Sequence, residues 1–95
     1  MNKSNRLTIE VNDNFQPNLN RSVIWIRCFG NKASLMSEQV LALKDIYAFD
    51  CEIVRLSSVS RFVWFGLIFL DKDATVAERF VLAVQDTFKE YIEKA

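Results

Sequence analysis

Nine consecutive residues without a polar side chain, FVWFGLIFL at 62–70, constrain the fold of this 95-residue chain more than any other feature. The run is far shorter than the roughly 20 residues that a membrane-spanning helix requires. Its aromatic and aliphatic composition is typical of a strand that is covered on both faces. Any fold proposed for the chain must therefore explain what covers each face of this strand.

Five other segments show a clear pattern of apolar and polar residues. The segments SVIWIRCFG at 22–30 and CEIVRLSS at 51–58 are rich in β-branched and aliphatic residues, which predicts strands. The apolar residues of 34–49 and 76–92 recur every three or four positions, which predicts two amphipathic helices. The segment LTIEV at 7–11 alternates as a half-buried strand does, and it is equally compatible with a frayed tail.

The order strand, helix, strand, strand, helix predicts an α+β protein. Its natural packing is a two-layer ferredoxin-like sandwich, β-α-β-β-α, with two helices on one face of the sheet. A right-handed crossover in the first strand–helix–strand unit places both helices on the same side. Residues 1–20 are expected to form an N-terminal segment, either a loop or an extra edge strand, and residues 21–95 a single α+β domain.

The charge balance and the cysteines indicate where such a protein works. Twelve Lys and Arg face twelve Asp and Glu, so no net charge attracts the chain to nucleic acid or to an anionic membrane. No apolar segment follows the basic residues at the start, so we expect no secretory signal. Cys28 and Cys51 both lie in apolar segments. These features predict a cytoplasmic protein with reduced, buried thiols and no membrane association.

Alternation along the strands sorts their side chains into two faces, and only one face can meet the helices. We expect the helix side to be the one without arginine, which is the set Ile24, Ile26, Cys28, Val54, Leu56, Phe62, Trp64 and Ile68. The opposite face is then expected to hold Trp25, Phe29, Val63, Phe65, Leu67 and Phe69, with Arg27, Arg55 and Arg61 among them. Apolar patches of that size are rare on soluble monomers, so this face is expected to need a cover.

Several covers are compatible with the sequence. A second copy of the chain can stack sheet on sheet, a different protein can dock, or the N-terminal segment with Phe15 and Leu19 can fold back over the face. A single-stranded nucleic acid can also stack on the rings. We expect a protein partner, with a homodimer as the preferred form. The residues predicted to bind it are Trp25, Arg27, Phe29, Arg55, Arg61, Phe65 and Phe69.

Two of the predicted strands resemble those of RNA-recognition domains. IWIRCF at 24–29 resembles the short strand motif of that family, in which an aromatic residue stacks on a base, and FGLIF at 65–69 resembles the longer motif. The resemblance covers only these two strands. Val63 and Trp64 stand where the longer motif has basic and glycine residues, and no fourth strand follows the last helix unless the N-terminal one replaces it. The resemblance implies an alternative function, the binding of RNA or single-stranded nucleic acid through the same face.

The sequence carries no motif of catalysis or cofactor binding. It has no histidine, which is the commonest general base and zinc ligand, and its cysteines lack a CxxC spacing. Glu52, Asp71 and Asp73 are more simply explained as capping and loop residues than as a cation site. We therefore expect no enzymatic activity, no cofactor and no metal. The sequence favours a small protein-interaction module that acts as a regulator, adaptor or inhibitor.

Overall fold

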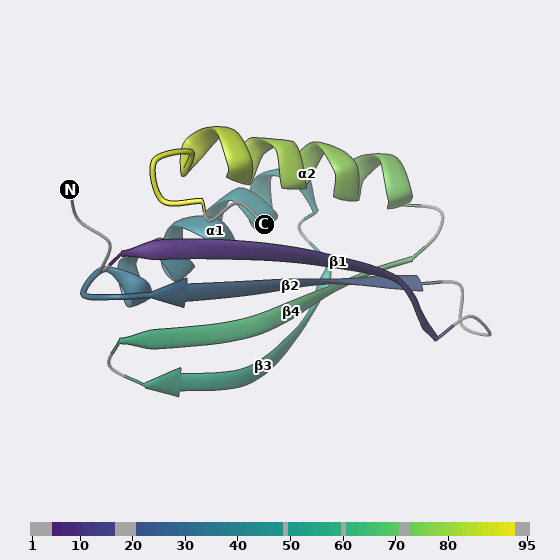
Figure 1. Ribbon diagram of the computed structural model, residues 1–95. Coiled ribbons are helices and arrows are strands. Elements are labelled where there is room, and N and C mark those ends of the chain that lie inside the picture. The colour runs from purple at the N-terminus through teal and green to yellow at the C-terminus, as the bar shows by residue number, and fades with distance from the viewer. Residues whose placement is uncertain (1–4, 17–20, 49, 60, 71–72, 93–95) are drawn as a thin grey trace.

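The computed structural model describes residues 5–16, 21–48, 50–59, 61–70 and 73–92, with the backbone alone at residues 12–16, 21, 55 and 56. This part of the chain forms four strands and two helices (Figure 1). They are β1 (Arg6–Gln16), β2 (Arg21–Phe29), α1 (Ala33–Tyr47), β3 (Glu52–Val59), β4 (Phe62–Leu70) and α2 (Ala74–Thr87). The α+β class and the order of the elements are confirmed, and residues 6–16 form a strand rather than a loop.

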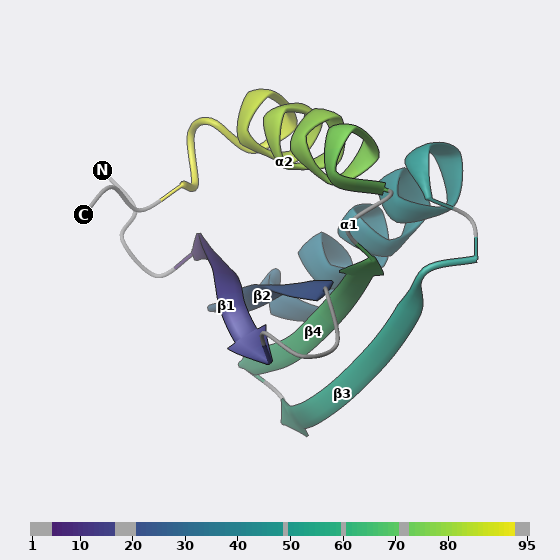
Figure 2. The ribbon, with the colours of Figure 1, turned by 90° about the vertical axis from the view of Figure 1, so that its right-hand side faces the viewer.

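The four strands form one antiparallel sheet in the order β1-β2-β4-β3. β2 and β4 are the central strands, β3 forms one edge, and β1 forms the other edge beside β2. Both helices lie against the same face of the sheet, as Figures 1 and 2 show from two directions. This two-layer arrangement is compatible with a ferredoxin-like fold in which β1 takes the place that a strand after α2 would occupy.

A glycine turn connects β2 to α1. Gly30 has φ 104°, a left-handed conformation that glycine adopts without a steric penalty. Its N–H donates to the carbonyl oxygen of Arg61 at 2.9 Å. Asn5, which precedes β1 and is buried, holds the next turn. The N–H of Lys32 donates to its Oδ1, also at 2.9 Å. These bonds fix the start of α1 over the end of the sheet where β1 and β4 begin.

The core lies between the sheet and the two helices. Alternate strand positions point toward the helices, and the inward faces of α1 and α2 complete the layer. The buried strand residues of the core are Leu7, Ile24, Ile26, Cys28, Val63, Phe65, Leu67 and Phe69. The helical layer contributes Ala33, Met36, Val40, Ala77, Phe80, Val84 and Phe88.

The predicted orientation of β4 is wrong. Phe65 pairs with Ile26 across the antiparallel ladder, so both side chains lie on the helix side. Arg61, which suggested the opposite assignment, lies in the turn before β4 and carries no information about the faces of the strand. The helix side therefore receives Val63, Phe65, Leu67 and Phe69. The opposite face receives Phe62, Trp64 and Ile68.

β3 requires a similar correction. Val54 pairs with Gly66, so it lies on the side away from the helices and not on the helix side as expected. A register shift between Arg55 and Ser57 then interrupts the ladder, which is the pattern of a β-bulge. The side chains of Arg55 and Leu56 lie outside the described part of the chain. Edge strands commonly carry such bulges, because a bulge hinders pairing with another chain.

α2 ends earlier than the apolar periodicity of the sequence. The pattern continues to Ile92, but the helix ends at Thr87 and the chain turns toward β1. The N–H of Leu7 donates to the carbonyl oxygen of Tyr91 at 2.8 Å, and Leu7 and Ile92 form a parallel bridge. Leu7 is fully buried at this point. Tyr91 and Ile92 thus continue the apolar pattern for a reason other than a helix, since both pack against the edge of the sheet.

Candidate interaction surface on the open sheet face

The sheet face turned away from the helices carries the strongest candidate site. None of the described elements lies over this face in either view (Figures 1 and 2). Residues paired across the ladders point to the same side, so alternate positions of β1, β2 and β4 supply its side chains. We define the open face by the residues Arg6, Thr8, Glu10, Trp25, Arg27, Phe29, Phe62, Trp64, Gly66 and Ile68.

Four aromatic rings form a connected row on the two central strands. The ring centroid of Phe62 lies 5.0 Å from that of Phe29 and 6.3 Å from that of Trp64. Trp64 in turn meets Trp25 edge to face, with 6.2 Å between the centroids. Aromatic pairs attract each other at such distances. Each of the four side chains is half-buried, so the rings shield one another and still keep part of their surface accessible.

Two arginines lie over this row of rings. Cζ of Arg6 is 4.4 Å from the centroid of the Phe29 ring, and Cζ of Arg27 is 4.8 Å from that of Trp64. Cation–π attraction at exposed sites contributes about 0.5–1 kcal/mol. Nη1 of Arg27 also lies 3.4 Å from Oε1 of Glu10, whose side chain is 60% exposed. Solvent screens an ion pair of this kind, so both charges remain available to a partner.

Gly66 makes room for the indole of Trp25. A Cβ atom at position 66 would lie 2.5 Å from Cζ3 and 2.7 Å from Cε3 of that ring. Side chains do not approach so closely, so any larger residue would displace the indole. The two residues are paired across β2 and β4. Glycine inside a strand often marks such a close approach, and here it sets the position of one of the four rings.

Two buried polar atoms of this face have no hydrogen-bond partner among the described residues. They are Oγ1 of Thr8 and Nε1 of Trp64. Both residues flank Arg27, because Thr8 pairs with it across β1 and β2, and Trp64 pairs with it across β2 and β4. Leaving such a group unsatisfied costs about 1–3 kcal/mol, and native structures contain few of them. Because both atoms are shielded from solvent, a partner does not reach them directly.

The structure brings together only part of the predicted partner-binding set. The residues that lie on the open face as expected are Trp25, Arg27 and Phe29. Phe65 and Phe69 do not lie there, because they are 0% and 2% exposed in the core. Arg61 is exposed in the turn that leads into β4, at the end of the face. The side chain of Arg55 lies outside the described part of the chain.

Seven residues of the open face were not among the predicted binding residues, namely Arg6, Thr8, Glu10, Gly66, Ile68, Phe62 and Trp64. A signal in the sequence could have placed the last two. The alternate set that begins at Phe62 contains Gly66, whereas the set that begins at Val63 is large and apolar at every position. A strand face that fills a core favours the set without a gap. The arginine positions were a weaker criterion, because turn residues have no fixed face.

The open face is covered at one position of β2. Val23 continues the same face of β2, opposite Ile68, and is only 2% exposed. Glu52 pairs with Ile68 from the other side and is exposed at the edge of the sheet. The cover is therefore local to Val23, and Ile68, like the four rings, remains half-buried.

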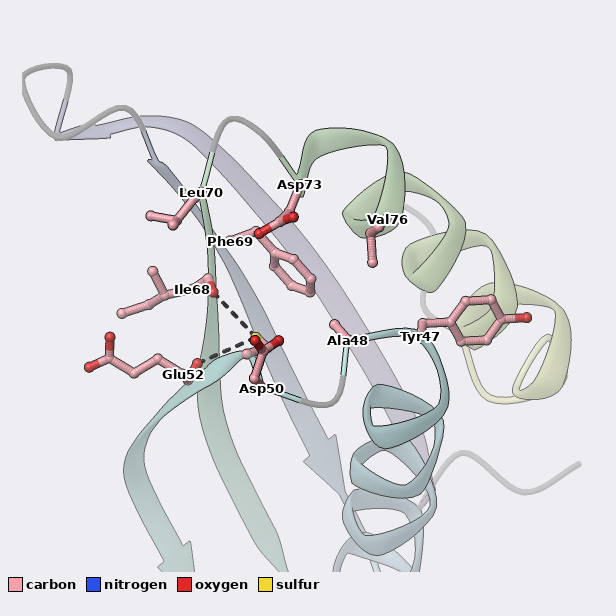
Figure 3. A pocket seen from close by; sticks show the side chains of 10 residues that line it. Tyr47, Ala48, Asp50, Glu52, Ile68, Phe69, Leu70, Asp73 and Val76 are labelled. Carbon is pink, nitrogen blue, oxygen red and sulfur yellow. Dashed lines mark hydrogen bonds between the residues drawn. The ribbon is translucent and has the colours of Figure 1, made fainter.

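A second candidate is a hollow of about 350 Å³ where α1 ends and α2 begins (Figure 3). Figure 3 shows the ring of Phe69 pointing from β4 toward α2, while Ile68 points away from the helices. The polar lining includes the carboxylates of Asp50, Glu52 and Asp73. Among the described residues, no Lys or Arg lines the hollow.

The thiol of Cys51 lies in this hollow but is not arranged as a nucleophile. It donates to the carbonyl oxygens of Ile68 at 3.3 Å and Glu52 at 3.5 Å, shown as dashed lines in Figure 3. Burial raises its pKa to about 11, although the charge of nearby Lys44 acts in the opposite direction. The thiol is therefore protonated at neutral pH, whereas thiolate is the reactive form. Burial likewise raises the pKa of Cys28 to about 12, and both cysteines are free.

An apolar groove of about 470 Å³ lies between α2 and the strands β1 and β2. Its rim includes Val11 and Leu82, which are 48% and 59% exposed. The polar residues in its described lining are Ser22 and Glu78. Ligand sites usually combine an apolar wall with several convergent polar groups, so this groove does not define a class of ligand.

The described residues contain no group of three or more His, Cys, Asp or Glu side chains that could hold a metal ion. Within the same ranges, neither helix is long and apolar enough to cross a membrane. No protein-family model, curated protein or solved structure matches this chain. The open face must therefore be interpreted from its own chemistry.

Proposed function

We propose that this protein is a small non-enzymatic interaction module that binds a protein partner through the open face, as a regulator, adaptor or inhibitor. The observation that carries the proposal is the connected row of four rings under two arginines, on a sheet face that no described element covers. Large aromatic residues and arginine dominate the energetics of protein interfaces. The rings of Trp25, Phe62 and Trp64 anchor the partner, and Arg6 and Arg27 orient it. A ferredoxin-like sandwich holds them in place.

Binding in this proposal is reversible, and the chain folds before it binds. The apolar residues of β4 that face the helices are buried in the core of a single chain. The rings of the open face shield one another and lie under arginine side chains, so their exposed apolar area is modest. Interfaces below about 1,200 Å² in total are typical of transient encounters. These features favour a partner that associates and dissociates over a permanent subunit.

The proposed compartment is the cytoplasm. Cys28 and Cys51 are free thiols. Thiols stay reduced in the cytosol, whereas secreted domains of this size commonly use their cysteines in disulfides.

Binding of single-stranded nucleic acid through the same face is the second candidate function. The observation in its favour is that Trp25 and Trp64 lie on the two central strands, where an aromatic platform can stack on bases. The charges oppose it, because among the described side chains Glu10 and Glu52 offset Arg6 and Arg27 on this side of the sheet and leave Arg61 at the end of the face. Phosphate contacts supply much of the affinity for nucleic acid. A protein partner is the better supported of the two.

The proposal is tested by capture from a native cell extract with three tagged forms of the protein. They are the wild type, Phe62→Asp on the open face, and Ile46→Asp on the outer surface of α1, where Ile46 is 74% exposed. The extract is treated with nuclease, and bound proteins are identified by mass spectrometry. We expect the wild type and Ile46→Asp to recover the same partner and Phe62→Asp to recover at least tenfold less of it, because the new carboxylate interrupts the row of rings.

Far-UV circular dichroism establishes that each variant is folded. Arg27→Glu serves as a second variant of the open face, because it keeps all four rings and replaces the guanidinium group over Trp64 with a carboxylate. Equal recovery by the wild type and by both variants of the open face would remove the proposed function. Binding that disappears with nuclease would assign the face to nucleic acid instead.

A further inference from the structure

We propose that the partner of the open face is a second copy of this chain, stacked sheet on sheet about a two-fold axis. The inference rests on the proposed function and names its partner. Two features carry it: the charges of the face complement themselves under a two-fold operation, and the size of the face matches a dissociable dimer.

The charged residues of the open face lie in positions that a two-fold axis can pair. Glu10 is level with Trp25 in the ladder of β1 and β2, and Arg27 lies two residues further along β2. Consider a two-fold axis that runs parallel to the sheet and across the strands, midway between these two levels. Rotation about this axis turns the open face of the second copy toward that of the first. Glu10 of one copy then reaches the level of Arg27 of the other. The ion pair within one chain, 3.4 Å between Nη1 and Oε1, can therefore be exchanged for a pair between chains.

The same operation pairs rings with cations. Trp25 and Arg27 exchange levels on β2, so the indole of one copy faces the guanidinium group of the other, and the reverse contact forms with it. Arginine stacks favourably on an indole. Two sheets that pack face to face lie about 10 Å apart, which leaves room for one layer of side chains from each copy. An identical face thus satisfies both the charge pairs and the contacts between Trp25 and Arg27.

The area of the face limits the affinity of such a dimer. Four strands about 4.8 Å apart span about 19 Å, and nine residues at about 3.3 Å each span about 30 Å, so one face covers on the order of 570 Å². Two faces together reach about 1,100 Å², which is near the lower limit for a specific interface. Because the face is covered at Val23, the contact is smaller than this sum. We therefore expect a dissociation constant on the order of micromolar or weaker.

Charge reversal tests this arrangement. Arg27→Glu makes the face acidic, and Glu10→Arg makes it basic. Sedimentation velocity over a range of concentrations measures the dissociation constant of the wild type, of each variant, and of an equimolar mixture of the two variants. We expect each variant alone to self-associate at least tenfold more weakly than the wild type, and the mixture to associate at least as tightly as the wild type. Glu38→Arg, on the exposed side of α1, is the matched control and should leave the wild-type constant unchanged.

Each contrary result has a separate meaning. A wild type that stays monomeric up to millimolar concentration overturns the inference that the partner is a second copy. Partner capture with the variants of the open face then still decides the proposed function. Self-association that both variants retain places the contact elsewhere and also overturns the inference. A mixture no tighter than its components overturns the two-fold pairing. A monomeric wild type that binds a labelled single-stranded oligonucleotide assigns the face to nucleic acid. If a reversed variant does not fold, Arg27→Gln and Glu10→Gln test the same charges, and each is expected to weaken self-association.

Discussion

At the scale of single residues, the open face depends on a packing relation between Gly66 and Trp25. We predict that Gly66→Ala displaces the indole, shifts the tryptophan fluorescence and lowers the free energy of unfolding by about 1–2 kcal/mol. In a Trp25→Ala background the same substitution should be neutral or stabilising, because glycine in a strand interior is itself unfavourable. Urea unfolding of the four proteins gives the coupling energy. A coupling near zero would mean that the added methyl group and the indole do not compete for the same space.

The buried thiol of Cys28 makes a second prediction at this scale, on pH dependence. Its pKa is raised from 9.0 to about 12 in the folded protein, since burial disfavours the thiolate. The thiol therefore contributes its full stability below pH 9, where both states are protonated. This contribution is lost as the pH rises from about 9 toward about 12, because the unfolded chain ionises first. The difference in unfolding free energy between the wild type and Cys28→Ala should shrink from pH 7 to pH 10.5 in urea titrations. A difference in unfolding free energy that does not change with pH would contradict this prediction.

At the scale of the elements, periodicity was sufficient to find the strands and both helices, but it did not orient β4. Alternation gives two sets of side chains, and the choice between them depends on which set the neighbouring strand turns toward the helices. That information lies in the pairing of Phe65 with Ile26, which is a long-range contact and is not encoded locally. The end of α2 was overestimated for a similar reason. Tyr91 and Ile92 continue the helical spacing, yet tertiary pairing with Leu7 determines their structure.

The helical layer supplies the prediction for this scale. Phe80 is fully buried in α2 and packs against Phe69, with 6.1 Å between the ring centroids. Phe80→Ala should lower the free energy of unfolding by about 3–5 kcal/mol, because it leaves a cavity. Leu82→Ala, two residues away and 59% exposed, should change it by less than about 0.5 kcal/mol. Urea unfolding compares the two. Similar losses in both variants would show that α2 packs with a different face toward the sheet.

At the scale of the whole molecule, β1 brings the N-terminal part of the chain to the edge of the sheet beside the residues that follow α2. It pairs with β2 along one side, and at Leu7 it meets Tyr91 and Ile92 on the other. Sequence patterns left open whether residues 1–20 form a loop or an edge strand. They did not give the contacts with Tyr91 and Ile92, because pairing between residues so far apart leaves no periodic signal. The arrangement implies that β1 belongs to the sheet through tertiary contacts, whichever end of the chain supplies it.

A circular permutant tests this implication directly. Joining Ala95 to Met1 and opening the chain between residues 18 and 19 places β1 after α2, in the order β2-α1-β3-β4-α2-β1. Residues 7 and 92 are already neighbours, so the joined segment needs to span only a short distance. Permutation between neighbouring ends is commonly tolerated. We expect the same circular dichroism spectrum and, for the free energy of unfolding, a change of at most about 1–2 kcal/mol, since moving one loop closure costs little. Leu7→Ala should destabilise the permutant and the parent equally, by about 2–5 kcal/mol, because the side chain is fully buried in both. A permutant in which Leu7→Ala has no effect would show that β1 needs its hairpin with β2 and is not held by the rest of the fold.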